Sequence, residues 1–276
     1  MSRVHDLFRN VVGEKHTLSS HASEPVPESI TRTFDRTFDL QDIPIVEAHI
    51  QAASRIVFQT DPNSPAADRF RALRMRLREL RNAGKVKSLL VSSPLPHDGK
   101  STVALNLATA LSEQGKRTVL LVEGDLHHST LTQSLGLGAW DGLTECLEGG
   151  INPLSAIRRV EPLGWYLLPA GARRSNATEL LQSATLSNVM QTLSPYFDWI
   201  VIDSPPVLPL TDALSLQRQT DACLLVVRAE QTSREAVEEA VALLGKQHLL
   251  GVILNGVEGL ERNYHKYGYC GTYGAK

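Results

Sequence analysis

The chain has 276 residues, 42% of them hydrophobic, which is enough for one sizeable core in a single domain plus a tail. Its formal net charge of −2 gives no electrostatic reason to expect nucleic acid as a partner. No apolar run approaches the length of about 18 residues that a membrane-spanning helix needs, so we expect neither a span nor a signal peptide. The three cysteines form no C-x-x-C pair and have no metal-ligand spacing, which favours a reduced, cytosolic compartment.

Residues 1–52 are polar, rich in Ser, Thr, His, Glu and Pro, and lack sustained periodicity. Such a composition buries too little apolar surface to offset the entropy cost of ordering, so we expect a disordered or weakly ordered tail. The apolar periodicity that follows predicts one domain over residues 53–262.

A long amphipathic helix is predicted from Ser64-Pro65 onward. Its apolar stripe consists of Phe70, Leu73, Leu77 and Leu80. One residue later, basic side chains repeat the same spacing: Arg71, Arg74, Arg78 and Arg81. This basic face has three readings: a solvated surface, a contact with an acidic surface of a neighbouring subunit, or a contact with anionic lipid.

The stretch 91–106, VSSPLPHDGKSTVALN, predicts a phosphate-binding loop. A short apolar run over 87–91 reads as a buried parallel strand, and Gly99 opens a helical pattern. A helix start presents free backbone N–H groups to phosphate oxygens, where Lys100 would reach the β- and γ-phosphates and Ser101 would ligate Mg2+. Pro94 stands where the common motif has its first glycine. The nucleotide-binding residues expected here are Pro96, His97, Asp98, Gly99, Lys100, Ser101 and Thr102.

Two further apolar runs end in acidic residues. The run over 118–122 leads into Glu123-Gly124-Asp125, and the run over 199–202 leads into Asp203. Because ligands of open parallel sheets bind beyond the carboxyl ends of the strands, these carboxylates should converge on the triphosphate. Asp203 and Asp125 are the expected Mg2+ ligands together with Ser101, since Mg2+ takes one or two carboxylates and keeps several waters. The alternative reading is that these acids are solvated turn residues.

The rest of the chain alternates strands with helices. Strands are expected over 164–168, 222–228 and 249–254, and helices over 178–193 and 233–244. This order predicts an α/β fold of the P-loop NTPase type, with a mostly parallel β-sheet and helices on both faces. Asn255, just past the last strand, either binds the nucleotide base or forms a turn with Gly256.

The C-terminal segment 263–276 carries four of the six tyrosines among interspersed glycines. It lacks helix and strand periodicity, so we expect a flexible tail whose tyrosines serve as phosphoryl acceptors. These tyrosines are Tyr264, Tyr267, Tyr269 and Tyr273. The alternative is a segment that packs on the domain or on another chain.

These motifs resemble those of the bacterial tyrosine autokinases of exopolysaccharide and capsule assembly. SSPLPHDGKST is similar to the family's Walker A loop, VLLVEGDL to its second acidic motif, and FDWIVIDSPPVLPLTDA to its Walker B segment. LLVVRAEQTSREA, LGVILNGV and the tyrosine cluster also match. The resemblance covers about three quarters of the chain, from Ser64 to the C-terminus.

The resemblance implies an ATP- and Mg2+-dependent kinase that phosphorylates its own tail in trans, with Lys100, Asp125 and Asp203 at the catalytic site. Glu123, or otherwise Asp125, would accept the tyrosine proton. It also implies a ring-like homo-oligomer whose interface uses Asp68, Arg71 and Arg74. A separate transmembrane chain-length-determinant protein would act as activator, so that a cytoplasmic chain contacts the inner face of the membrane only through this partner.

The chain departs from the family pattern in the second acidic motif. Glu123 replaces Asp, and His127, His128 and Ser129 replace Arg-Arg-Pro. Two other functions therefore stay open. One is a partitioning or positioning ATPase of the same fold, although Leu95 occupies the place of that family's extra lysine. The other is a nucleotide-gated scaffold of the polysaccharide machinery without kinase activity.

Overall fold

The computed structural model describes residues 38–50 and 55–257. Its centre is an eight-stranded sheet in the order β1-β4-β5-β3-β6-β2-β7-β8. Every neighbouring pair is parallel except β4 and β5. The strands are β1 Ile45–Glu47, β2 Ser88–Ser92, β3 Val119–Glu123, β4 Arg158–Glu161, β5 Trp165–Leu168, β6 Trp199–Asp203, β7 Ala222–Arg228 and β8 Leu249–Asn255.

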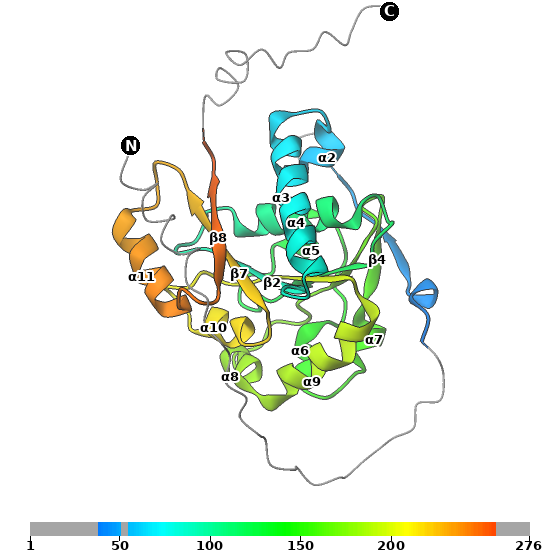
Figure 1. Cartoon of the computed structure of the whole chain (residues 1–276). Helices are drawn as coiled ribbons and strands as arrows, with labels where there is room; N and C mark the ends of the chain where they lie inside the picture. Colours follow the sequence, from blue (N-terminus) through cyan, green and yellow to red (C-terminus); the bar gives the residue numbers. More distant parts are fainter. Residues whose placement is uncertain (1–37, 51–54, 258–276) are drawn as a thin grey trace, which may run out of the picture. The chain divides into compact units, whose positions relative to one another are not determined.

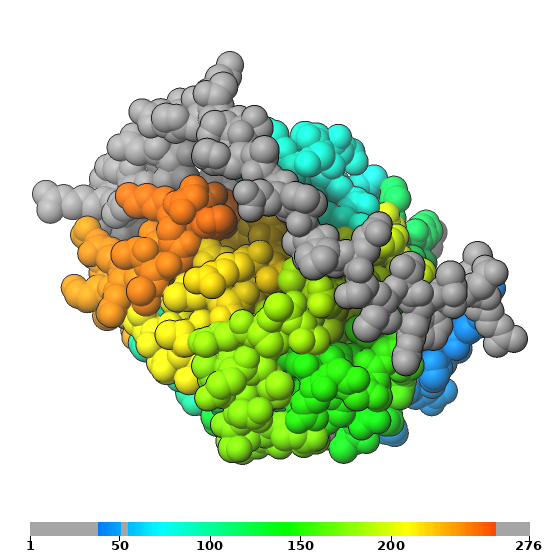
Figure 2. Space-filling model, turned by 90° about the horizontal axis from the view of Figure 1, so that it is seen from below, coloured from blue at the N-terminus to red at the C-terminus, as the bar shows by residue number. Residues whose placement is uncertain are grey.

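Helices cover both faces of this sheet, with α3 and α4 on one side and α8, α9 and α10 on the other (Figure 1). Figure 2 shows the side of the molecule that carries α8, α9 and α10, which appear in green to yellow. The α-helices are α2 Val57–Thr60, α3 Pro65–Asn82, α4 Lys100–Ser112, α5 Leu131–Ser134, α6 Leu143–Leu147, α7 Pro153–Ala156, α8 Ala177–Gln182, α9 Ala184–Leu193, α10 Asp212–Gln217 and α11 Arg234–Leu244. Short 3-10 helices lie at η1 Leu40–Asp42 and η2 Ser194–Tyr196. The expected fold class is confirmed.

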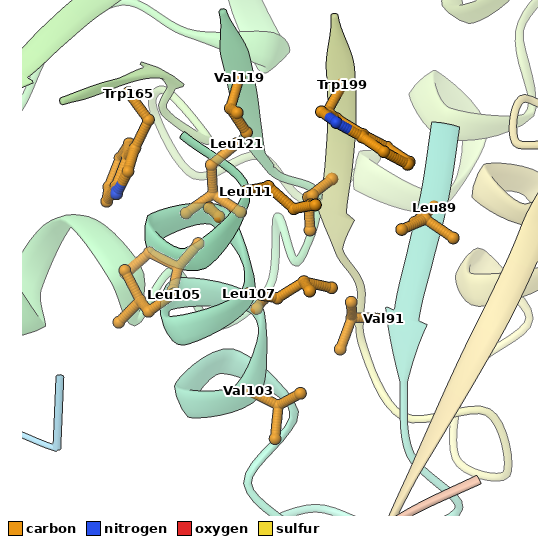
Figure 3. Packing of buried hydrophobic residues seen from close by; sticks show 14 of the residues in the cluster. Leu89, Val91, Val103, Leu105, Leu107, Leu111, Val119, Leu121, Trp165 and Trp199 are labelled. Atoms are coloured by element: carbon orange, nitrogen blue, oxygen red, sulfur yellow. The ribbon is translucent and has the colours of Figure 1, made fainter. Parts of the chain in front are cut away.

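The core lies between α4 and the central strands. Leu107 and Leu111 of α4 are fully buried, as are Leu89 of β2 and Leu121 of β3. Figure 3 shows these side chains meeting between the helix and the sheet, together with Trp165 and Trp199. The central strands are covered on both faces, which is why they read as continuous apolar runs rather than alternating ones. This packing fixes the start of α4 at the carboxyl end of β2.

The helix expected over 178–193 is in fact two helices. Ser183 has an extended backbone (φ −71°, ψ 153°) and separates α8 from α9. Its hydroxyl donates a 2.7 Å hydrogen bond to the carbonyl of Leu180, the kind of local serine contact that competes with helix continuation. The apolar periodicity continues across the break, so the sequence pattern alone did not reveal it.

The sheet begins before the boundary expected at residue 52. β1 pairs with β4, and Ala48 N donates to the carbonyl of Glu161 at 2.8 Å. Residues 1–37 and 258–276, and with them most of the two expected tails and all four tail tyrosines, lie outside the described residues. In the part of the chain that is described, no helix is both long and apolar enough to cross a bilayer.

The arginines of α3 bind to their own domain. Arg78 lies 3.2 Å from the Glu113 carboxylate. Arg81 lies 3.2 Å from the Asp198 carboxylate and stacks over the ring of Trp199, with 5.3 Å from guanidinium to ring centroid. Arg74 also donates to the carbonyl of Ala110 in α4, so three of the four arginines of the expected basic face help to hold α3 on the domain.

Candidate active site

The loop between β2 and α4 ends in a residue that only glycine can occupy. Gly99 has φ +96°, and a Cβ at this position would lie 2.0 Å from the side-chain nitrogen of Asn255. The first hydrogen bond of α4 runs from Val103 N to the carbonyl of Gly99 at 3.0 Å. The preceding N–H groups, from Lys100 to Thr102, lie ahead of the helical ladder and are the groups that bind anions at a helix start.

Lys100 and Asp125 form an ion pair beside this helix start. The Lys100 ammonium group lies 3.5 Å from an Asp125 oxygen, and the two side chains are 14% and 6% exposed. Asp203 lies at the same corner, because it is the register partner of Val91 in β2 and of Glu123 in β3, and Gly124 N donates to its carbonyl at 2.8 Å. Lys100 and Ser101 both lower the pKa of its carboxyl group. The structure thus brings together Lys100, Ser101, Asp125 and Asp203, from α4, the loop after β3 and the end of β6.

The environment of Asp203 fits a metal ion. The residue is 1% exposed, and its Oδ1 atom has no hydrogen-bond partner among the described residues. Burial raises the pKa of Asp203 to about 7, while Lys100 and Ser101 oppose this shift. A buried carboxylate oxygen without a donor is costly unless a cation compensates it. Ser101 and Asp203 together offer the hard oxygen ligands that Mg2+ prefers.

The Glu123 carboxylate is bonded to α5 and to the loop after β5, an arrangement that does not favour its expected role as proton acceptor. Its carboxylate accepts hydrogen bonds from Leu131 N at 2.7 Å, from Thr132 Oγ1 at 2.5 Å and from Ala170 N at 3.3 Å. The residue is 1% exposed. One methylene more than aspartate carries the carboxylate to the start of α5 and to the loop after β5. Glu123 thus links β3 to α5 and to the loop after β5, whereas Asp125 lies beside Lys100.

The loop after β3 is held at two further points. His128 N donates to Asp125 Oδ1 at 2.9 Å. His127 Nε2 lies 2.8 Å from Asp212 Oδ2, and Asp212 is fully buried at the start of α10. His127 therefore contacts the site through its ring, and His128 through its backbone N–H. The contact to Asp212 was not predicted, although Thr211-Asp212 belongs to the Walker B segment.

The remaining loop residues divide into exposed and buried positions. Pro96 and His97 are exposed at the tip of the loop, while Asp98 is 4% exposed. The Asp98 carboxylate turns into the protein and accepts a 2.6 Å hydrogen bond from Thr232, which sequence reasoning missed. Asn255 donates to the Asp98 carbonyl at 2.9 Å, so it touches the loop itself. No sequence signal marks Thr232, because its partner lies 134 residues away.

The expected interface residues lie on α3. Arg71 donates to Asp68 at 2.8 Å and lies over the ring of Phe58. Arg74 donates to the carbonyl of Ala110 at 3.3 Å. Met75, on the same helix, is 62% exposed. The interface arginines therefore have contacts within their own chain.

Comparison with known proteins decides the family. A family model described as an AAA domain matches residues 98–249, more than half of the chain. The tyrosine-protein kinase YwqD of Bacillus subtilis is 30% identical over 219 residues, which cover 79% of this chain and 91% of that protein. The chain belongs to the bacterial tyrosine-protein kinases. The succinoglycan biosynthesis transport protein ExoP of Rhizobium meliloti is also 30% identical, and the match covers 79% of this kinase and 30% of that protein.

Solved structures agree with this assignment. The chimerical protein CapA2B2 matches with a TM-score of 0.68 and 30% identity, over 77% of this kinase and 93% of that chain. The septum site-determining protein MinD of Pyrococcus horikoshii, solved with Mg-ADP, matches with a TM-score of 0.53 and 29% identity, over 61% of this kinase and 69% of that chain. The family resemblance read from the sequence is confirmed, and the positioning ATPases share the fold.

Proposed function

We propose that this tyrosine kinase uses Mg-ATP to phosphorylate the tyrosines of its own C-terminal segment in trans, and that it thereby regulates exopolysaccharide or capsule assembly. The observation that carries the proposal is the meeting of Lys100, Ser101, Asp125 and Asp203 at the start of α4. The Mg-ADP bound to MinD and the biosynthetic role in the name of ExoP support the nucleotide and the pathway.

In this mechanism the N–H groups at the start of α4 and Lys100 hold the phosphates. Ser101 and Asp203 would hold Mg2+, with Asp125 as an outer ligand, and the bound metal would supply the charge that neutralises phosphate oxygens. When Lys100 turns to phosphate, Asp125 loses its ion pair and becomes free to accept the phenolic proton. The tyrosine oxygen bonds to the γ-phosphorus as the bond to the leaving ADP oxygen breaks.

Mass spectrometry of residues 263–276 after incubation with Mg-ATP tests this function. Phosphate on Tyr264, Tyr267, Tyr269 or Tyr273 is expected in the wild-type chain and not in Lys100→Met. Lys116→Met serves as the matched control, because Lys116 is an exposed lysine outside the site. Retained tail phosphorylation in Lys100→Met, purified alone, would show that the catalytic site has been misplaced.

The trans arrangement is tested by mixing two chains. One carries Lys100→Met with an intact tail, and the other carries an intact site with all four tail tyrosines changed to Phe. Phosphate on the Lys100→Met chain supports transfer between subunits, whereas its absence in a mixture whose active chain hydrolyses ATP contradicts it. Hydrolysis without any phosphotyrosine in the wild-type chain would instead favour a positioning ATPase.

We also propose that the chain works beside a separate transmembrane activator at the cytoplasmic side of the membrane, as the family resemblance implies. Adding a peptide from the cytoplasmic end of a candidate activator should raise the rate of tail phosphorylation. A rate that the peptide leaves unchanged would contradict the action of that candidate as activator.

A further inference from the structure

Asp98 ties the phosphate-binding loop to a distant part of the chain. Its Oδ2 atom accepts a hydrogen bond from Leu95 N at 3.1 Å, which closes the loop on itself. Its Oδ1 atom accepts from the Thr232 hydroxyl at 2.6 Å. Thr232 lies in the connection between β7 and α11. A hydroxyl-to-carboxylate bond of this length is charge-assisted, and such bonds are stronger than those between neutral groups.

The Thr232 hydroxyl is itself fixed by the sheet. It accepts a 3.1 Å hydrogen bond from the backbone N–H of Arg228, the last residue of β7. A hydroxyl has one proton to donate, and with the Arg228 N–H on its oxygen that proton is directed to Asp98. The chain of contacts therefore runs from a strand of the buried sheet through Thr232 to the loop.

A second contact holds the same residue from the neighbouring strand. Asn255 ends β8 and donates to the Asp98 carbonyl at 2.9 Å. Arg228 and Asn255 are register partners across β7 and β8, and Ala229 N donates to the Asn255 carbonyl at 2.8 Å. The ends of the two strands thus form one rigid support that contacts Asp98 through its side chain and its backbone.

The backbone on either side of Asp98 needs such support. His97 has φ +68° and Gly99 has φ +96°, so left-handed residues flank Asp98 on both sides. A non-glycine residue in this region persists only where its surroundings hold it there. The N–H groups that follow must point at phosphate before it arrives, because donors that are already oriented stabilise charge without reorganisation.

We propose that Thr232 is a positioning residue for nucleotide binding, which through Asp98 holds the phosphate-binding loop in the conformation that presents its N–H groups to phosphate. This inference rests on the Mg-ATP binding proposed above. Thr232 acts on the nucleotide only through Asp98, and the support from β7 makes the loop conformation a property of the folded sheet rather than of the loop sequence.

The test compares Thr232→Val, which keeps the shape and removes the hydroxyl, with Thr232→Ser, which keeps the hydroxyl. Thr220→Val is the matched control, since Thr220 precedes β7 and its hydroxyl donates only to the nearby Gln217 carbonyl. Calorimetric titration of the full chain with Mg-ATP should give about a tenfold higher Kd for Thr232→Val and about the wild-type value for the other two. In kinase assays the loss should fall on KM for ATP more than on kcat.

Two results would overturn the inference. Thr232→Val could lower the melting temperature while binding Mg-ATP as tightly as the wild type, which would make its role purely structural. Asp98→Asn weakens the same hydrogen bond from the other side. The double variant, Thr232→Val with Asp98→Asn, should therefore bind Mg-ATP no more weakly than whichever single variant has the higher Kd. Additive losses of binding free energy would contradict the link between the two residues. A wild-type chain that fails to bind Mg-ATP would instead remove the proposed function, and the inference with it.

Discussion

The carboxylate of Glu123 accepts a 2.7 Å hydrogen bond from the backbone N–H of Leu131, the first residue of α5. Thr132 and Ala170 donate to the same carboxylate. The side chain thus joins the end of β3 to α5 and to the loop after β5. Thr132 donates through both its N–H and its hydroxyl, so four donors share the two carboxylate oxygens, and this arrangement does not favour accepting a proton from tyrosine.

Glu123→Gln is therefore expected to reduce stability rather than chemistry. Removing the charge weakens hydrogen bonds to a buried group, which lowers the free energy of unfolding by about 1–3 kcal/mol. Denaturant unfolding measures this change, and the phosphorylation rate per folded molecule should stay within about threefold of the wild type. Asp125→Asn is the contrasting variant: its rate should fall at least ~10²-fold. A pH–rate profile altered by Glu123→Gln would reinstate Glu123 as the proton acceptor.

Asp203 predicts a pH dependence of stability in the nucleotide-free chain. Burial raises its pKa from 3.8 to about 7 in the folded state. Between about pH 4 and pH 7 the folded state binds more protons than the unfolded state, so stability falls as pH rises through this window and levels off above it. Asp203→Asn should remove this contribution and raise the melting temperature at pH 8.

The melting temperature in the presence of Mg-ATP provides the control for Asp203→Asn. Mg-ATP should raise the melting temperature of the wild-type chain, because ligand that binds only the folded state stabilises it, and should have little effect on Asp203→Asn. Equal stabilisation of both chains by Mg-ATP would show that Asp203 is not a metal ligand.

Arg81 is expected to stabilise the attachment of α3. It donates to the Asp198 carbonyl and carboxylate and stacks on Trp199. Arg81→Met should lower the free energy of unfolding by about 1–3 kcal/mol, since a hydrogen bond between charged groups and a cation–π contact are lost together. Arg76→Met, on the exposed side of the same helix, is the control and should leave the unfolding midpoint unchanged. Equal effects of the two substitutions would contradict the assigned role.

Arg71 is expected to affect the association of subunits rather than the stability of the single chain. Its side chain is 37% exposed beside Asp68, at the expected subunit interface. Arg71→Glu should weaken self-association at least about tenfold, because a reversed charge opposes the acidic surface expected on the neighbouring subunit. Sedimentation velocity over a concentration series measures this, with Arg76→Glu as the control. Unchanged association would exclude this face of α3 as the interface.

Much of the fold could be read from the sequence because buried parallel strands and amphipathic helices leave periodic patterns. β7 was predicted at its observed bounds, Ala222–Arg228, and α11 within one residue of them. The break at Ser183 and the short strand β1 were missed, since a local hydrogen bond and a three-residue strand leave no period to detect.

The sequence by itself determined the α/β class, the loop before α4 and the family, because each is carried by residues adjacent in the chain. Only the tertiary structure decided which partners Glu123, Asp98 and Thr232 contact. The direction of a buried side chain depends on partners far away in sequence, as the 134 residues between Thr232 and Asp98 show. A sequence motif gives the residue types and their spacing, whereas the packing of the sheet determines which of these side chains face the nucleotide.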